Sequence, residues 1–366
     1  MTTGTGATGR TSVQASKIVK LQGPPEKFDH KGVISFGARH IIEKQYPQLL
    51  DLAEKGVLAA VQRPADYVER RDDGYREPEV VFVVGTAHFS EQSADDVRRV
   101  VEAVQPENVV LEVCKSRAAV IYEPTQSAGV GRTPNDMSLS GPNFAAALLR
   151  SARLGGNTAM LLRAVLSAQA DRVSAALGTR SGVEMRSGRA AAERVGAQIV
   201  LGDRPIEITL QRAWAALSWR QRWQLLSALW QSRGEAADVS ADAVEAMKDD
   251  DVISSVVAEY SAAFPEMVSP LLHERDMYLA WSLKRSKAVN GSRAVVGVVG
   301  KGHLRGVLYH LVTPDSSGLR FRDLVGSKNV RLSRGERLRR AGKRLALEAL
   351  LAGGCYAAWT AAFPPG

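Results

Sequence analysis

The chain has 366 residues, enough for one large domain or two of ordinary size. Its apolar fraction of 45% is typical of a globular protein and excludes wholesale disorder. The net charge is +9, but residues 331–344 alone hold seven basic residues against one acid, so the rest of the chain is close to neutral. This distribution argues against a basic nucleic-acid-binding face, and we predict no nucleic-acid partner.

Cysteine usage and the N-terminal composition bear on the compartment. Cys114 and Cys355 lie far apart and match no metal-ligand or disulfide spacing, which indicates a reducing, intracellular environment. Residues 1–25 contain no acid, a composition that fits either an organelle transit peptide or a disordered extension. We therefore assign residues 1–37 to an N-terminal extension and residues 38–328 to the main domain.

The first predicted elements form a helix followed by a strand–helix–strand unit. Residues 38–69 carry a rough apolar stripe and are predicted to be helical. The VVFVV run at residues 80–84 is typical of a strand buried on both faces, as in a parallel sheet. Ser90 is predicted to cap a helix with valines at 97, 100, 101 and 104 on its buried face. A second buried strand over residues 109–113 completes a βαβ unit.

The remaining elements extend this alternation. Residues 123–143 are predicted to form a long loop, and the Ala-rich residues 144–177 a helical segment. A helix over 184–195 precedes a strand over 198–201, and further helices are predicted across 208–232 and 239–289 before a last strand over 294–299. We interpret the tryptophans at 214, 219, 223 and 230 as packing anchors. Together these elements predict an α/β fold with a mostly parallel central sheet, flanking helices and a helical insertion.

Polar residues follow four of the predicted strands. They are His88, Glu112, Asp203 with Arg204, and His303. In open α/β sheets, ligands bind beyond the carboxyl ends of the strands, so we expect these side chains to line one cleft. Two of them share a pattern, because His88 and His303 each end a Gly-x-x-His sequence directly after a buried run.

Each of these residues also has a structural interpretation. A histidine at a strand end is often a hydrogen-bonded core group rather than a ligand. Glu112 lies in an apolar run, where an ionised carboxylate needs a partner, and Arg204 is the candidate partner in a buried ion pair. The Glu-Arg-Asp triplet at residues 274–276 is interpreted as an ordinary charged helix face.

Several of these segments together resemble a known family. The VVGTAHFS sequence at 83–90 and the VVLE sequence at 109–112 resemble the opening of TraB-family proteins, the TraB/PrgY/GumN group. Residues 182–185, 202–206, 274–276 and 300–304 resemble its later blocks and occur in the same order. The resemblance covers about residues 80–306 and implies a fold similar to Tiki proteases and to erythromycin-esterase and ChaN-like proteins.

The resemblance implies a metal-dependent chemistry. In Tiki-like members, paired Gly-x-x-His motifs and acidic residues support divalent-metal-dependent proteolysis, with manganese or cobalt favoured. The matching positions imply His88 and His303 as metal ligands and Glu112 and Glu184 as ligand or base. We expect Arg204, which follows a predicted strand, to line the same cleft as a further site residue. Imidazole and carboxylate suit such a metal, which activates water. We expect a hydrolase acting on a peptide or protein substrate; the alternative is a non-catalytic adaptor or regulatory protein that retains the fold.

The C-terminal segment, residues 329–366, combines a basic stretch with an apolar tail. Residues 345–363 are 19 mainly apolar residues directly after the basic cluster, near the length that spans a bilayer. Glu348, Gly353 and Gly354 weaken this hydrophobicity, so a packed or amphipathic terminal helix is the alternative. We expect the tail to bind a membrane. The family's mitochondrial members imply the mitochondrial outer membrane, with a plastid membrane or the cytosol as alternatives.

Overall fold

A computed structural model describes residues 23–68, 73–87, 90–122, 182–231, 264–313 and 324–325. All of these residues belong to one compact unit, Met1–Val325. His88, the predicted loop and helical insertion over 123–177, and the C-terminal tail lie outside the described residues, as do residues 1–22.

The described strands form one five-stranded sheet in the order β1-β2-β5-β3-β4. Its strands are β1 (Leu58–Gln62), β2 (Val80–Thr86), β3 (Asn108–Leu111), β4 (Gln198–Leu201) and β5 (Ala294–Gly300). β1 pairs antiparallel with β2, whereas β2 with β5, β5 with β3, and β3 with β4 are parallel pairs. The predicted α/β fold with a mostly parallel sheet is confirmed.

The helices occur before, between and after these strands. The longer ones are α1 (His30–Gly37), α4 (Glu91–Val104), α7 (Val183–Val195), α8 (Ile206–Ala216), α9 (Trp219–Gln231), α12 (Glu274–Lys284) and α13 (Lys301–Val312). The shorter helical segments are η1 (Ala38–Ile42), α2 (Glu43–Gln45), η2 (Pro47–Leu49), α3 (Leu50–Glu54), η3 (Lys115–Ile121), η4 (Pro265–Met267), η5 (Ser269–His273) and η6 (Lys287–Val289).

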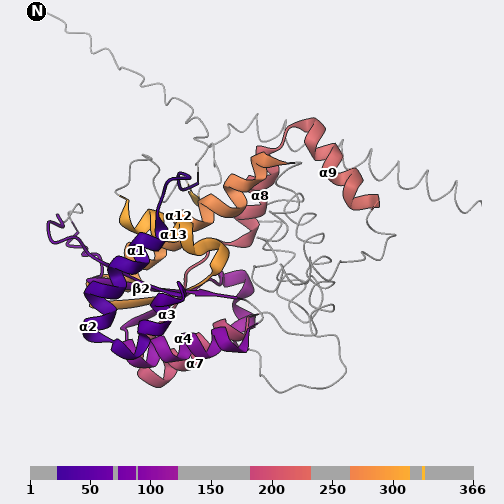
Figure 1. Ribbon diagram of the computed structural model, residues 1–366. Coiled ribbons are helices and arrows are strands. Elements are labelled where there is room, and N and C mark those ends of the chain that lie inside the picture. The colour runs from indigo at the N-terminus through magenta and orange to yellow at the C-terminus, as the bar shows by residue number, and fades with distance from the viewer. Residues whose placement is uncertain are drawn as a thin grey trace, which may run out of the picture. The chain divides into compact units, whose positions relative to one another are not determined.

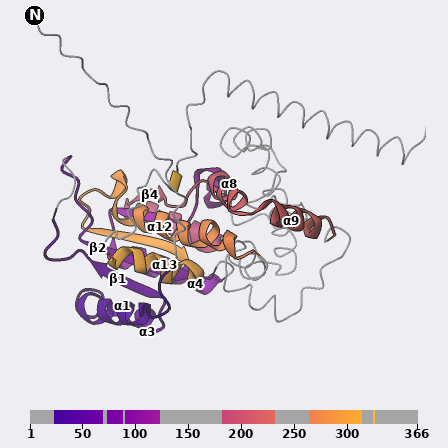
Figure 2. The same cartoon turned by 90° about the horizontal axis from the view of Figure 1, so that it is seen from above.

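Helices cover both faces of the sheet. Because side chains alternate along a strand, Phe82 and Val84 face the core formed with α3, α4 and α7, whereas Val81 and Val83 face the core formed with α1, α12 and α13. Figure 1 shows α12 and α13 above the sheet and α4 and α7 below it, and Figure 2 gives the view from above. The two apolar faces explain why the strands contain continuous runs of Val, Ile and Leu.

Helix α4 forms as its sequence predicts. The Ser90 hydroxyl accepts a hydrogen bond from the backbone N–H of Ser93 at 3.3 Å and so caps the first turn. Val97, Val100 and Val101 are fully buried against the sheet, which confirms the predicted apolar face. The helix leads directly to β3, whose four residues are all buried.

The predicted helix over residues 38–69 is wrong after Glu54. Residues Leu58–Gln62 instead form the edge strand β1. Their short, Ala-rich apolar run has no clear period, so its pattern fits a buried helix as well as a strand. The backbone pairing with β2 decides between the two. Gly37 lets α1 approach this strand, since a Cβ there would lie 2.2 Å from the carbonyl oxygen of Ala60.

The tryptophans of α9 differ from their interpretation as packing anchors. Trp219 and Trp223 are 69% and 56% exposed and contact each other edge to face. The buried face of α9 instead carries Leu225, and helical spacing puts Trp223 about 160° and Trp219 about 120° away from it around the helix axis. Trp214 of α8 does pack against an apolar cluster. The side chain of Trp230 lies outside the described part of the structure.

Candidate functional site

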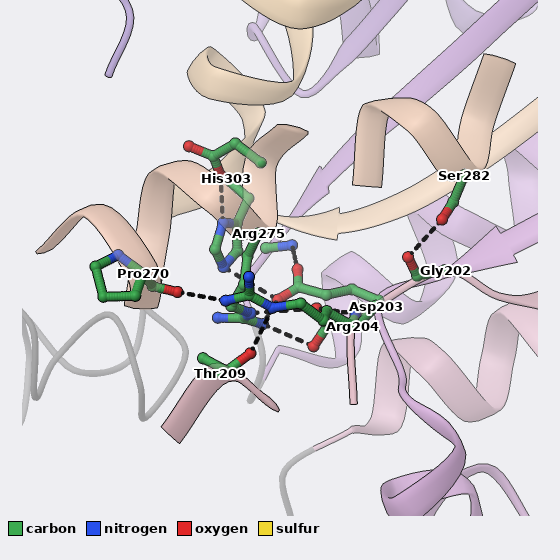
Figure 3. Close-up of polar contacts among 11 residues, drawn as sticks. Gly202, Asp203, Arg204, Thr209, Pro270, Arg275, Ser282 and His303 are labelled. Atoms are coloured by element: carbon green, nitrogen blue, oxygen red, sulfur yellow. Dashed lines mark hydrogen bonds and ion pairs between the residues drawn. The ribbon is translucent and has the colours of Figure 1, made fainter. Parts of the chain in front are cut away.

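Three strand ends bring buried polar residues together. Glu112 follows β3, Asp203 follows β4, and His303 lies in the first turn of α13, directly after β5. Because β3 lies between β5 and β4, these three ends are neighbours at the carboxyl edge of the sheet. The three residues are 3%, 4% and 0% exposed. Figure 3 labels Asp203 and His303 of this cluster, together with Arg204 and with Arg275 of α12.

Both carboxylate oxygens of Glu112 are held. Oε1 accepts a hydrogen bond from Nη2 of Arg275 at 2.6 Å, and Oε2 accepts one from the backbone N–H of Gly300 at 2.7 Å. The strand register explains the second contact, because Leu111 pairs with Val298, so Glu112 lies beside the last residues of β5. The structure thus satisfies a buried carboxylate that would otherwise be costly.

The imidazole of His303 lies between two carboxylates. Its Nδ1 is 2.6 Å from Oδ1 of Asp276, a hydrogen-bond distance. Its Nε2 is 3.2 Å from Oε1 of Glu112, an ion-pair contact. Among the described residues, however, Nε2 has no partner in hydrogen-bond geometry. One ring nitrogen is therefore fixed, while the other faces Glu112 without a hydrogen bond.

Charge around His303 determines its protonation. Burial and the charge of Arg275 lower the pKa of the imidazole, but the charge of Glu112 and the hydrogen bond with Asp276 outweigh them and raise it to about 10. At neutral pH, the imidazolium therefore neutralises part of the negative charge of the two carboxylates. A metal ion that binds Nε2 would have to displace the proton there.

Arg275 is the second cation of the cluster. Besides contacting Glu112, its guanidinium donates to both oxygens of Asp203, at 3.2 and 3.1 Å. Asp203 also accepts the backbone N–H of Arg204 at 2.7 Å. The sequence interpretation that paired Glu112 with Arg204 is therefore wrong, because Arg275 of α12 occupies that position.

Arg204 is fully buried and binds a neighbouring set of groups. Its Nε donates to Oγ1 of Thr209 at 3.0 Å, its Nη1 to Oε2 of Glu274 at 2.5 Å, and its Nη2 to the carbonyl of Pro270 at 2.7 Å. Glu274 also accepts from Nη2 of Arg212 at 2.7 Å. These contacts connect the turn after β4 to η5 and α12, so Arg204 supports the site from the side. A direct role for Arg204 in the chemistry stays a prediction.

The triplet at residues 274–276 is not an exposed helix face, and the interpretation of it as one is wrong. Glu274, Arg275 and Asp276 are 5%, 0% and 2% exposed. The sequence did carry a signal for this burial, because the apolar residues Met277, Leu279, Ala280 and Leu283 follow the triplet on the same helix. The structure buries all four of them. An α-helix that buries residues all around must lie inside the fold, so its charged residues must have partners there.

The comparison with known proteins agrees with this architecture. A model of the TraB/PrgY/gumN family matches residues 73–312, well over half of the chain. The chain belongs to this family. A TraB domain-containing protein of Bos taurus is 30% identical over 312 residues, which cover 78% of this chain and 79% of the relative. One of Homo sapiens is 32% identical over 250 residues, covering 64% and 62%. An uncharacterised protein of Methanocaldococcus jannaschii is 24% identical over 233 residues, covering 63% and 53%.

The remaining predicted site residues of this TraB-family domain differ in what the structure says of them. Glu184 is fully buried in the first turn of α7, and its role stays a prediction. His88 lies outside the described ranges, so its predicted meeting with His303 also stays a prediction.

The described residues can be tested for whether their arrangement fits a metal ion. Within those ranges, no group of three or more His, Cys, Asp or Glu side chains is arranged to hold an ion. The pair of His303 and Glu112 does fit two neighbouring ligands, because the buried Nε2 has no hydrogen bond and faces a carboxylate oxygen. A third ligand would have to come from elsewhere, and His88 is the candidate from the sequence.

Proposed function

We propose that this TraB-family domain is a divalent-metal-dependent hydrolase with a peptide or protein substrate. The observation that supports it most is the His303–Glu112 pair, with Nε2 and Oε1 3.2 Å apart. Metal–nitrogen and metal–oxygen bonds are each about 2.0–2.2 Å, so two ligands of one ion lie about 3 Å apart. The spacing of the pair matches that requirement.

Each proposed site residue would have its own role in the reaction. His303 and Glu112 would be two ligands of the ion, and His88 is the proposed third ligand. Glu184 is the proposed further ligand or base. A mixed imidazole and carboxylate set suits manganese or cobalt, and such an ion supplies a water of lowered pKa as the nucleophile. Arg275 limits the negative charge of Glu112 and so moderates how strongly the carboxylate attracts a cation.

Direct metal binding tests this proposal. The full-length protein is incubated with Mn²⁺ or Co²⁺, passed over a desalting column and analysed for bound metal. We expect about one ion per chain in the wild type and loss of the ion in H303Q and E112Q. Glu193, half-exposed on α7, provides the control, because E193Q keeps the charge change away from the pair. A wild-type protein that retains no metal, or variants that bind as E193Q does, would contradict the proposal.

Hydrolysis is tested separately on an unstructured protein such as casein. Fragments should appear only with metal present and should disappear with a chelator and in H303Q. A protein that binds metal but cleaves nothing favours the alternative, a non-catalytic adaptor or regulatory protein with the same fold.

We also propose that the protein associates with an organelle membrane, most specifically the mitochondrial outer membrane, with a plastid membrane as the alternative. The support is the sequence of residues 331–363, where seven basic residues precede 19 mainly apolar ones. Among the described helices, none is long and apolar enough to cross a membrane. The tail itself lies outside the described residues.

A further inference from the structure

The first turn of α12 contacts both members of the His303–Glu112 pair. Arg275 donates to Glu112, and the next residue along the chain, Asp276, holds His303. The residue before them, Glu274, is equally buried but binds Arg204 and Arg212 instead. Two consecutive residues therefore hold the two halves of the proposed ligand pair, while a third on the same turn does not contact it.

We infer that Arg275 and Asp276 are positioning residues that set the geometry of the His303–Glu112 pair, an inference that rests on the proposed function. Adjacent Cα atoms are fixed about 3.8 Å apart by the peptide unit. Because both contacts originate from neighbouring residues of one helix, the imidazole and the carboxylate cannot move independently. The turn of α12 holds them at the spacing that a shared ion needs.

Asp276 acts on the orientation of the ring. Its carboxylate, 2% exposed, is 2.6 Å from Nδ1 and therefore keeps a proton on that nitrogen. The nitrogen left for a ligand is Nε2, which is the one that faces Glu112. The sequence of α13 accommodates this arrangement, because a Cβ on Gly306 would lie 2.0 Å from Oδ2 of Asp276. Gly306 is one turn beyond His303, so the same helix face carries the histidine and the space for its partner.

Arg275 acts on the carboxylate. Its Nη2 fixes Oε1 of Glu112 while the backbone of Gly300 fixes Oε2, so the carboxylate cannot rotate freely. The same Nη2 also donates to Oδ2 of Asp203 and Nε donates to Oδ1, which anchors the guanidinium to the end of β4. A planar guanidinium suits this double contact, and a lysine ammonium does not reproduce it.

A measurement on the metal-free protein tests the role of Asp276 directly. The Nδ1–H proton of His303 is donated to a charged carboxylate, so it should give a downfield resonance in the proton NMR spectrum of histidine-labelled protein. Loss of this resonance in H303Q assigns it. In D276N the resonance should move upfield, because a neutral amide is a weaker acceptor. In E274Q it should not move. An unchanged resonance in D276N would overturn the inference, whether or not the protein binds metal.

Metal affinity tests whether the positioning of His303 and Glu112 by α12 matters for binding an ion. Loss of a residue that orients a ligand typically weakens metal binding on the order of 10–100-fold. We expect Mn²⁺ titrations of the full-length protein to show that loss for D276N and for R275K, with E274Q within about twofold of the wild type. R275K keeps the positive charge and His303's partner, so it reports on the Glu112 half even where D276N does not fold.

The outcomes separate this inference from the proposed function. A wild-type protein without Mn²⁺ affinity removes the proposed function, and the NMR comparison then decides alone whether Asp276 orients His303. Affinities that fall equally in E274Q, D276N and R275K would show that the turn of α12 only supports the fold, which overturns the positioning role. Unchanged affinities in D276N and R275K would overturn it as well.

Discussion

At the scale of single residues, Glu274 links the buried network to pH. Burial raises the pKa of its carboxyl, but hydrogen bonding from Arg212 and the charge of Arg204 outweigh burial, so the pKa is lowered overall. Burial also lowers the pKa of Arg204, yet a guanidinium stays protonated at any pH at which the protein is folded. The carboxylate of Glu274 is therefore the member of this network that titrates as acid is added.

The lowered pKa of Glu274 determines how the free energy of unfolding should change with pH. Because the folded pKa of Glu274 lies below its unfolded value of about 4.3, its ion pairs contribute stability above that pH and lose it as the pH falls through the folded value. The free energy of unfolding should therefore fall more steeply in the wild type than in E274Q below about pH 5. Urea unfolding followed by circular dichroism between pH 7 and pH 3 measures both slopes. Parallel slopes would show that Glu274 is not linked to acid unfolding.

The sequence located the site residues better than it located their partners. Glu112 and His303 were predictable because each follows a continuous buried run, and parallel strands place their carboxyl ends at one edge. The identity of the cation beside Glu112 was not predictable from the sequence. Arg275 is 163 residues away in sequence, and nothing in the composition near Glu112 distinguishes it from Arg204. Such a choice depends on how α12 packs, which only the folded structure shows.

At the scale of elements, the contact between α12 and α13 depends on residue 306 being a glycine, which has no side chain. A Cβ on Gly306 would lie 2.0 Å from a carboxylate oxygen of Asp276. G306A should therefore lower the free energy of unfolding by roughly 1–3 kcal/mol, despite the better helix propensity of alanine. Gly302, exposed on the same helix, is the matched control, and G302A should instead stabilise by about 0.5–1 kcal/mol. Opposite signs for the same chemical change are expected, and equal signs would contradict the close approach.

Strands and helices differed in how far their patterns identified them. β2, β3 and β5 contain dense valine runs that few helices share, and the sequence predicted each within a residue or two. β1 is short and Ala-rich, so its pattern did not distinguish a strand from a helix, and its pairing with β2 makes it a strand. In α9, large aromatic residues suggested burial, but their helical spacing from Leu225 puts Trp219 and Trp223 on the exposed face. In α9, therefore, helical periodicity was a better guide to burial than residue type.

At the scale of the whole molecule, the layered α/β fold was predictable because strands that are apolar on both faces need helices on both sides. Attachment to a membrane is a separate property that depends on residues 331–363, whose basic and apolar parts follow each other directly. All described helices and strands belong to the unit Met1–Val325, so we expect removal of the tail to leave that fold intact. The tail can therefore be tested by truncation without loss of the domain.

The last prediction is that the tail alone determines membrane attachment. A fluorescent fusion of the full chain should mark an organelle envelope, which we expect to be mitochondrial, and a chain ending at Asn329 should be released to the cytosol. The reason is that residues 345–363 provide about the length of a bilayer core, flanked by basic residues that favour the cytosolic side. As the matched control, residues 330–366 fused to a fluorescent protein should reach the same membrane. If the truncated chain stays on the organelle, the tail is not the anchor, and the acid-free residues 1–25 become the targeting segment to test.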